Sequence, residues 1–317
     1  MNQYIARRLL GMIPTLLLLV ALVVLLTRMM PGDVIDQLLL EQAADAQARQ
    51  QMEEQLGLNK SLTQQYLDYL AGVVRGDFGS SLLNHRPVFD MISERVNITI
   101  ELAALSMLIA WTIGATIGTL SAISQNTPLD YALRILGILG LTIPTFALAI
   151  AVVLLPAIWW GWSPPLSYVS FFSDPVSHLS QFVLPAIVLG VFSAGSIMRF
   201  TRTTMLEVFR QDYVRTARAK GLRQRTVLFR HGIRNALIPL LSVFGLQTAT
   251  LISGTVIVES IFALPGMGRL LLDAVESRDY PVIQGVTLIV GAFVMIVNLL
   301  VDLSYPLLDP RIKLARN

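Results

Sequence analysis

The sequence predicts an all-α integral membrane protein with six transmembrane helices. Hydrophobic residues make up 54% of the 317 residues and charged residues only 14%, whereas a soluble domain usually has about a quarter of its residues charged. The mean hydropathy is +0.63. Uncharged apolar runs long enough to cross a bilayer as helices lie at residues 9–27, 102–122, 135–159, 179–198, 236–258 and 282–301.

The basic residues predict how these spans are oriented. Six spans place both chain ends on the same side of the membrane. Lys and Arg are enriched in cytoplasmic segments, and most of the 24 Lys and Arg residues fall on the side that would hold both ends. We therefore expect both the N-terminus and the C-terminus in the cytoplasm. The same rule accounts for the pI of 9.3, so we expect no nucleic-acid partner.

The first span is expected to remain as an anchor rather than to be cleaved as a signal peptide. Its apolar run is longer than the usual hydrophobic region of a signal peptide, and Met29-Met30-Pro31 lacks the small residues of a cleavage site. The polar, helix-prone segment 31–96 then lies outside the cytoplasm. It is either a small exterior cap or a contact surface for an extracytoplasmic partner. A second exterior loop is expected near residues 160–178.

The span centres contain no Asp, Glu, Lys, Arg or His. An ionisable group at mid-bilayer is costly and is kept for a function such as a proton relay; the nearest candidates, Glu101 and Asp302, lie close to span ends. This pattern argues against an ion-coupled carrier. The three histidines, His85, His178 and His231, lie on both sides of the membrane and cannot form one metal site. The chain has no P-loop or hydrolase motif, so we expect no enzyme, no metal site and no cofactor in this chain.

The most informative segment is a basic loop between the fourth and fifth spans, residues 199–236. It contains two acids, Glu207 and Asp212. Its ten basic residues are Arg199, Arg202, Arg210, Arg215, Arg218, Lys220, Arg223, Arg225, Arg230 and Arg234.

The apolar residues of this loop predict two short amphipathic helices joined by a turn at Gly221, a residue suited to the left-handed conformation that ends a helix. Helical spacing of three or four residues recurs on both sides of the turn. The first stripe is Leu206, Phe209, Tyr213 and Ala217, and the second is Leu222, Thr226, Phe229, Ile233 and Leu237.

Three interpretations of the loop compete. A solvated loop that only sets topology needs no apolar stripes. A helix-turn-helix that binds DNA is disfavoured because both of its ends run directly into membrane spans. A docking element, whose apolar stripe fits a groove on a cytoplasmic protein, needs this pattern and is the interpretation we favour.

Two runs in the loop carry a specific resemblance. Residues 212–222 read Asp-Tyr-Val-Arg-Thr-Ala-Arg-Ala-Lys-Gly-Leu, and residues 230–239 read Arg-His-Gly-Ile-Arg-Asn-Ala-Leu-Ile-Pro. Together they resemble the coupling loop of ABC-importer permeases, and more narrowly that of the first permease subunit of the dipeptide/oligopeptide/nickel family. Further signatures agree in order along nearly the whole chain, at residues 5–9, 31–33, 76–81, 86–88, 143–146, 258–262, 265–269, 278–284 and 309–312.

One feature departs from the general permease motif, which begins Glu-Ala-Ala and has Gly four residues after the second Ala. Here the first three positions read Arg215-Thr216-Ala217, while Gly221 is present. The peptide branch of the family commonly departs in this way. The departure nevertheless leaves no leading Glu to make a contact.

The resemblance implies a type I importer fold in a bacterial inner membrane, organised as an anchor helix (1–30), an extracytoplasmic segment (31–96), a permease domain (97–305) and a cytoplasmic tail (306–317). It implies a second homologous permease, two ATPase subunits that bind ATP and Mg²⁺, and an extracytoplasmic solute-binding protein, besides membrane lipid. The residues expected to couple to the ATPase are Leu206, Phe209, Asp212, Tyr213, Arg215, Ala217, Arg218 and Gly221.

The solute stays open, because peptides, glutathione and nickel complexes are all carried by relatives of this family. Two other functions also stay open from the residues alone. One is an ion-coupled secondary carrier, and the other is a membrane scaffold that recruits a cytoplasmic protein without transporting anything.

Overall fold

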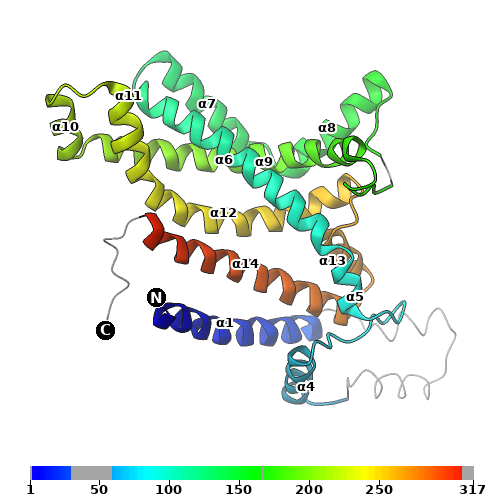
Figure 1. Cartoon of the computed structure of the whole chain (residues 1–317). Helices are drawn as coiled ribbons and strands as arrows, with labels where there is room; N and C mark the ends of the chain where they lie inside the picture. Colours follow the sequence, from blue (N-terminus) through cyan, green and yellow to red (C-terminus); the bar gives the residue numbers. More distant parts are fainter. Residues whose placement is uncertain (1, 30–58, 166, 309–317) are drawn as a thin grey trace. The chain divides into compact units, whose positions relative to one another are not determined.

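The structure of the chain is a computed structural model, and it describes residues 2–29, 59–165 and 167–308 (Figure 1). These residues form helices joined by turns, with one isolated bridge between Ser80 and Pro87 and no strand among them. Residues 31–58 of the expected extracytoplasmic segment 31–96, with the signature at 31–33, lie outside the described residues, as do the tail residues 309–317 with the signature at 309–312. The helices divide into two compact units, which are described separately.

The first unit is residues 98–265 together with the chain from Ile296 onward. Its helices are α6 (Val96–Ile123), α7 (Pro128–Thr142), α8 (Thr145–Trp160), α9 (Pro175–Phe209), α10 (Asp212–Ala219), α11 (Gln224–Thr226), the π-helix η1 (Val227–Ile233), α12 (Arg234–Ile261) and the last part of α14 (Tyr280–Leu308).

Helix α9 is the centre of this unit. It packs along α12 on one side and α7 on the other (Figure 1). Asp174 caps its first turn by accepting hydrogen bonds from the amides of Val176 and Ser177, which satisfies donors that a helix start leaves open. Phe182 and Leu189 of α9 and Leu251 of α12 are almost fully buried in one core cluster. This core holds α9 and α12 together.

Helix α6 approaches α9 closely through two glycines one turn apart. A Cβ atom added at Gly114 would lie 2.7 Å from the carbonyl oxygen of Ala194, and one added at Gly118 would lie 2.6 Å from that of Met198. Both distances are too short for a side chain. Small residues at this spacing let the backbones of two membrane helices meet.

The predicted third span, 135–159, is not one helix. It is divided at Ile143 and Pro144 into α7 and α8, which meet at 91°. Proline cannot donate the hydrogen bond that would continue α7, and it forces the residue before it out of helical geometry; Ile143 is extended, with φ −76° and ψ 119°. The other five predicted spans lie within single helices that are long and apolar enough to cross a membrane, and α7 with α8 makes a sixth if the bent pair is counted as one.

The second unit is residues 2–97 and 266–295. Its helices are α1 (Asn2–Met29), α4 (Leu62–Val74), α5 (Val88–Ser93), α13 (Met267–Glu276) and α14 as far as Met295. One cluster of buried side chains joins them, including Val20, Val88, Leu270 and Val286. The Ser81 hydroxyl and the Leu82 amide both donate hydrogen bonds to the carboxylate of Asp279, which fixes the segment before α5 to the turn before α14.

Candidate functional site

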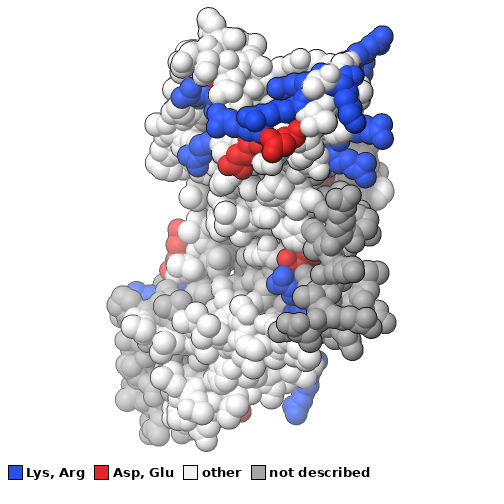
Figure 2. Space-filling model, turned by 90° about the vertical axis from the view of Figure 1, so that its left-hand side faces the viewer, with Lys and Arg blue, Asp and Glu red and all other residues white. Residues whose placement is uncertain are grey.

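The residues predicted to couple to an ATPase lie in a helical platform that we define as residues 199–236. It consists of the end of α9, then α10, α11 and η1, and the start of α12. Lys and Arg side chains gather in a band on the face of the molecule over α10 and α11, with few acidic side chains among them (Figure 2). The platform is therefore strongly basic, as its sequence indicates.

The first of the two predicted short helices, which would carry Leu206, Phe209, Tyr213 and Ala217 in one stripe before Gly221, is not one continuous helix. Helix α9 ends at Phe209, Gln211 is extended with ψ 146°, and α10 begins at Asp212. A carboxylate in the first turn favours a new helix start, because it interacts well with the positive end of the helix dipole. Leu206 and Phe209 thus belong to the end of α9, and the predicted stripe is divided between two helices.

The apolar face of α10 packs on the chain's own platform. Val214 and Ala217 are buried, at 0% and 5% exposure, and they form a cluster with Val227 against which Val208 and Phe209 pack. Leu206 and Phe209 also contact the adjacent cluster formed around Met205 and Ala236. Of the predicted coupling residues, Phe209 therefore supports α10 from the end of α9, Leu206 packs in the adjacent cluster, and little of Ala217 is left for a partner.

The outer face of α10 carries the other predicted residues. Tyr213 is 43% exposed, and burial of the rest of its ring raises its pKa, so the phenol stays neutral and can donate a hydrogen bond. Asp212 and Arg215 are both highly exposed and form a loose ion pair at 3.6 Å. The Arg218 guanidinium lies over the ring of Phe209, 5.8 Å from its centroid. This face can offer polar, aromatic and charged contacts together.

Gly221 ends α10 in the way the sequence predicts. Its φ is +74°, and its amide donates to the carbonyl of Arg218 while the Leu222 amide donates to that of Ala217. These two bonds form a Schellman motif, which satisfies the last carbonyls of a helix. The left-handed conformation favours glycine because it has no Cβ.

The second predicted short helix is not a separate element. Residues 224–233 form α11 and then a π-helix, η1, which continues directly into α12. Gly232 of η1 lies against the end of α9, where a Cβ atom would be 2.9 Å from Phe209. The chain therefore passes from the loop into α12 without a turn. The wider π-helix accommodates the aromatic ring of Phe209 beside Gly232.

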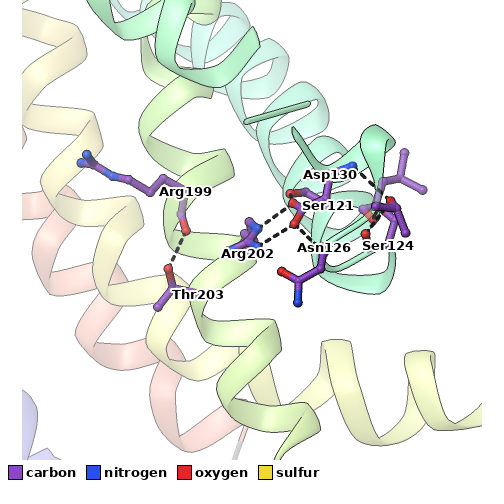
Figure 3. Close-up of polar contacts among 9 residues, drawn as sticks. Ser121, Ser124, Asn126, Asp130, Arg199, Arg202 and Thr203 are labelled. Atoms are coloured by element: carbon purple, nitrogen blue, oxygen red, sulfur yellow. Dashed lines mark hydrogen bonds and ion pairs between the residues drawn. The ribbon is translucent and has the colours of Figure 1, made fainter. Parts of the chain in front are cut away.

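A buried ion pair joins the base of the platform to α7 (Figure 3). The Arg202 guanidinium of α9 donates two hydrogen bonds, at 2.9 and 2.8 Å, to the two carboxylate oxygens of Asp130. The Ser121 hydroxyl at the end of α6 and the Asn126 amide donate to the same carboxylate. Asp130 is fully buried and Arg202 is 19% exposed. Paired guanidinium bonds of this kind are strong and directional, so this clamp fixes the ends of α6, α7 and α9 to one another.

The sequence reasoning missed this clamp. Asp130 lies 72 residues before Arg202, and in the sequence Arg202 is only one of the ten basic residues of the loop. A weak signal existed: Thr127-Pro128 opens a helix whose first turn contains Asp130, the only acid between the second and third predicted spans. Nothing in that pattern names its partner.

A second polar cluster ties the loop before α9 to two helices of the same unit. His178 is fully buried; its Nδ1 donates to the carbonyl of Val169, and its Nε2 lies 2.6 Å from the carboxylate of Glu101 on α6. The Gln181 amide group donates to the carbonyl of Ser167. Among the described residues, no group of three or more His, Cys, Asp or Glu could hold a metal ion.

Two family descriptions match the chain. "Binding-protein-dependent transport system inner membrane component" matches residues 114–314, and the corresponding N-terminal description matches residues 1–103. Together they cover both units, the platform and the clamp.

Curated relatives match over the full length. The di/tripeptide transport system permease protein DppB of Pseudomonas aeruginosa is 39% identical, and the alignment covers 100% of both chains. The dipeptide transport system permease protein DppB of Escherichia coli K12 is 37% identical, and its glutathione transport system permease protein GsiC is 38% identical; each of these alignments covers 99% of both chains. Among solved structures, the MetNI methionine ABC transporter in an inward facing conformation matches with a TM-score of 0.57 and 17% identity, over 69% of this chain and 96% of that one.

Proposed function

Because the chain belongs to the family of binding-protein-dependent transport system inner membrane components, it is a membrane subunit of an ABC importer, and we propose that it carries peptides or a related small solute. It is a permease of the bacterial inner membrane, and in this family ATP is hydrolysed by separate subunits. The relatives named for di- and tripeptides, dipeptides and glutathione support a peptide-like solute.

The partners follow from the same proposal. A second homologous permease forms the translocation path with this chain. Two ATPase subunits, which bind ATP and Mg²⁺, contact the two permeases from the cytoplasm, and an extracytoplasmic binding protein delivers the solute.

The observation that supports coupling through this chain is the packing of α10. Its inner face is fixed by Val214 and Ala217, while Tyr213 and Arg215 on its outer face are exposed. An ATPase that grips this outer face can push α10 only together with the end of α9. The clamp between Arg202 and Asp130 then passes that displacement to α7, as rigid-body switching requires.

We test this by placing a charge on the outer face. Tyr213→Glu removes an aromatic contact and adds a carboxylate, so solute uptake by cells is expected to fall about tenfold or more, a loss typical of a buried interface aromatic. Phe229→Glu is the matched control, because Phe229 is also exposed but lies on η1 outside α10. The measurement is uptake of a labelled dipeptide, with ATP hydrolysis by the purified importer followed in parallel. Equal uptake in the two variants would contradict the assignment of the contact to α10.

Gly221 gives a second comparison. Gly221→Glu puts a bulky charged residue at φ +74°, and we expect it to uncouple hydrolysis from uptake without preventing membrane insertion. Gly221→Asn tolerates that conformation better and should keep most of the uptake. Normal uptake in the Glu variant would count against the coupling role of this turn.

The solute itself is tested by comparing uptake of a labelled dipeptide, a tripeptide and glutathione in cells with and without the chain. Uptake of a peptide that depends on the chain supports the proposal. If uptake of none of the three solutes depended on the chain, a peptide-like solute would be excluded.

A further inference from the structure

A cavity of about 340 Å³ lies beside the platform, within the first unit. One wall is apolar and comes from the last turn of α6 and from the ends of the platform helices, through Ala122, Ile123, Leu206 and Leu228. Three arginines from three different segments, Arg210, Arg218 and Arg225, also line the cavity. No Asp or Glu lines the cavity.

These arginines are not neutralised by the part of the chain that the structure describes. None of the three forms an ion pair there. Two of them lie over aromatic rings: Arg218 is 5.8 Å from the centroid of Phe209, and Arg225 is 5.9 Å from that of Phe229. Ring contacts orient a guanidinium but add no negative charge. Three cationic side chains therefore line one small cavity, where an anion would relieve the repulsion among their charges.

We propose that this cavity binds the phosphate group of an anionic phospholipid. Guanidinium groups match phosphate oxygens with paired hydrogen bonds, and three positive charges outweigh the roughly half negative charge at the C-terminal end of α6. The apolar wall favours a lipid as the source of the phosphate. Ile123 is the last residue of a candidate membrane span and is 41% exposed, so the cavity lies where that span leaves the bilayer, at the level of the headgroups.

The site shares Arg218 with the face of α10 proposed above to contact an ATPase, but its other two arginines do not belong to that face. Arg210 and Arg225 lie outside α10, in the turn before it and in α11. A bound headgroup would join the end of α6 to α11 through the lipid, and would hold the base of the platform at the membrane surface. The proposal does not depend on the identity of the transported solute or on the ATPase.

The test uses the purified full-length chain, freed of lipid, and native mass spectrometry with two phospholipids of the same acyl chains. We expect phosphatidylglycerol to bind about tenfold more tightly than phosphatidylcholine. In the double variant Arg210→Gln with Arg225→Gln, which leaves the proposed coupling residues intact, this preference should be lost. The matched control is Arg223→Gln with Arg230→Gln, which removes the same charge from exposed positions of the same loop that do not line the cavity, and it should keep the preference.

Three results would overturn the proposal. One is equal binding of the two lipids by the unchanged chain. Another is an equal loss in both double variants, which would mean that only the general charge of the platform attracts the lipid. The last is displacement of phosphatidylglycerol by an equal concentration of inorganic phosphate, which would make the ligand a soluble anion. Phosphatidylcholine binding and the far-ultraviolet circular dichroism of each variant show whether it is folded. A variant that fails this check is replaced by the Arg→Lys pair at the same positions. That pair should retain the preference for phosphatidylglycerol.

Discussion

Asp130 and Arg202 form an ion pair that is largely removed from solvent, with Asp130 fully buried. Removing two charges from water is costly, and their attraction offsets that cost only when the geometry is good and the other hydrogen bonds are made. Both conditions hold here, because Ser121 and the Asn126 amide donate to the carboxylate oxygens that Arg202 also contacts. The pair therefore specifies how three helix ends meet more than it adds to net stability.

The loss in the free energy of unfolding should depend on whether one partner or both partners of the pair are replaced. Asp130→Ala leaves Arg202 buried without its carboxylate, and losses of about 3–5 kcal/mol in the free energy of unfolding are typical of such changes. Replacing both residues, Asp130→Leu with Arg202→Met, should recover most of that loss because no charge then stays buried. The thermal midpoint of the purified chain in detergent measures both.

The control for this pair is Arg199→Gln, since Arg199 lies on the same helix but is exposed and should change the midpoint little. If Asp130→Ala also left the midpoint unchanged, the clamp would be unimportant for stability. Solute uptake by the double variant then separates the two roles: a stable protein with low uptake would show that the charges position the platform.

At the scale of elements, the bend between α7 and α8 is the feature that shapes the predicted third span. Large apolar side chains of both helices, such as Leu136 and Leu154, are exposed in the isolated chain at 57% and 50%. Such a surface suits lipid or another membrane subunit. The bend redirects it by 91° within one span.

We predict that Pro144 causes this bend. Pro144→Ala restores the missing backbone donor, so α7 and α8 should straighten into one helix. Spin labels at Leu136→Cys and Leu154→Cys report this, since the chain has no cysteine of its own. Eighteen residues of straight helix span about 27 Å, against about 20 Å for the bent pair at a rise of 1.5 Å per residue.

The matched control is Pro156→Ala, because Pro156 lies inside α8 where the helix does not break. It should leave the distance between the labels unchanged. A distance near 20 Å in the Pro144→Ala variant would mean that packing against α9 and α12, rather than the proline, holds the bend.

The same prolines show how far the sequence could predict these elements. The length of each uncharged apolar run predicts where a span lies, and five of the six predicted spans lie in single helices. However, Pro156, Pro185 and Pro239 lie inside continuous helices, whereas Pro144 ends one. Local sequence alone does not distinguish these cases, because neighbouring helices decide whether the lost hydrogen bond is tolerated.

The predicted site shows a similar limit. The spacing of Tyr213 and Ala217 correctly places both on a helix, and Gly221 correctly ends it. Spacing does not reveal what an apolar face touches, and Ala217 packs on Val227 of the same chain. The contact of Asp130 with Arg202 joins residues far apart in sequence and could not be predicted from local pattern.

At the scale of the whole molecule, the positive charge of the platform has a consequence for topology. The platform carries ten of the 24 Lys and Arg residues of the chain, and moving so many charges across a bilayer is costly. Phe172 lies in the loop that leads into the first residue of α9, whereas the platform begins at the other end of α9. The two segments should therefore lie on opposite sides of the membrane, with the platform in the cytoplasm.

Labelling of single cysteines with a membrane-impermeant maleimide tests this orientation. Phe172→Cys is suited to the exterior position because Phe172 is 98% exposed, and Arg223→Cys is suited to the platform because Arg223 is also exposed. In intact spheroplasts we expect the cysteine at 172 to react and the one at 223 to stay unlabelled. In inside-out vesicles the pattern should reverse, since each position then faces the other compartment. Labelling at 223 in intact spheroplasts would place the platform outside, where no cytoplasmic ATPase could reach α10.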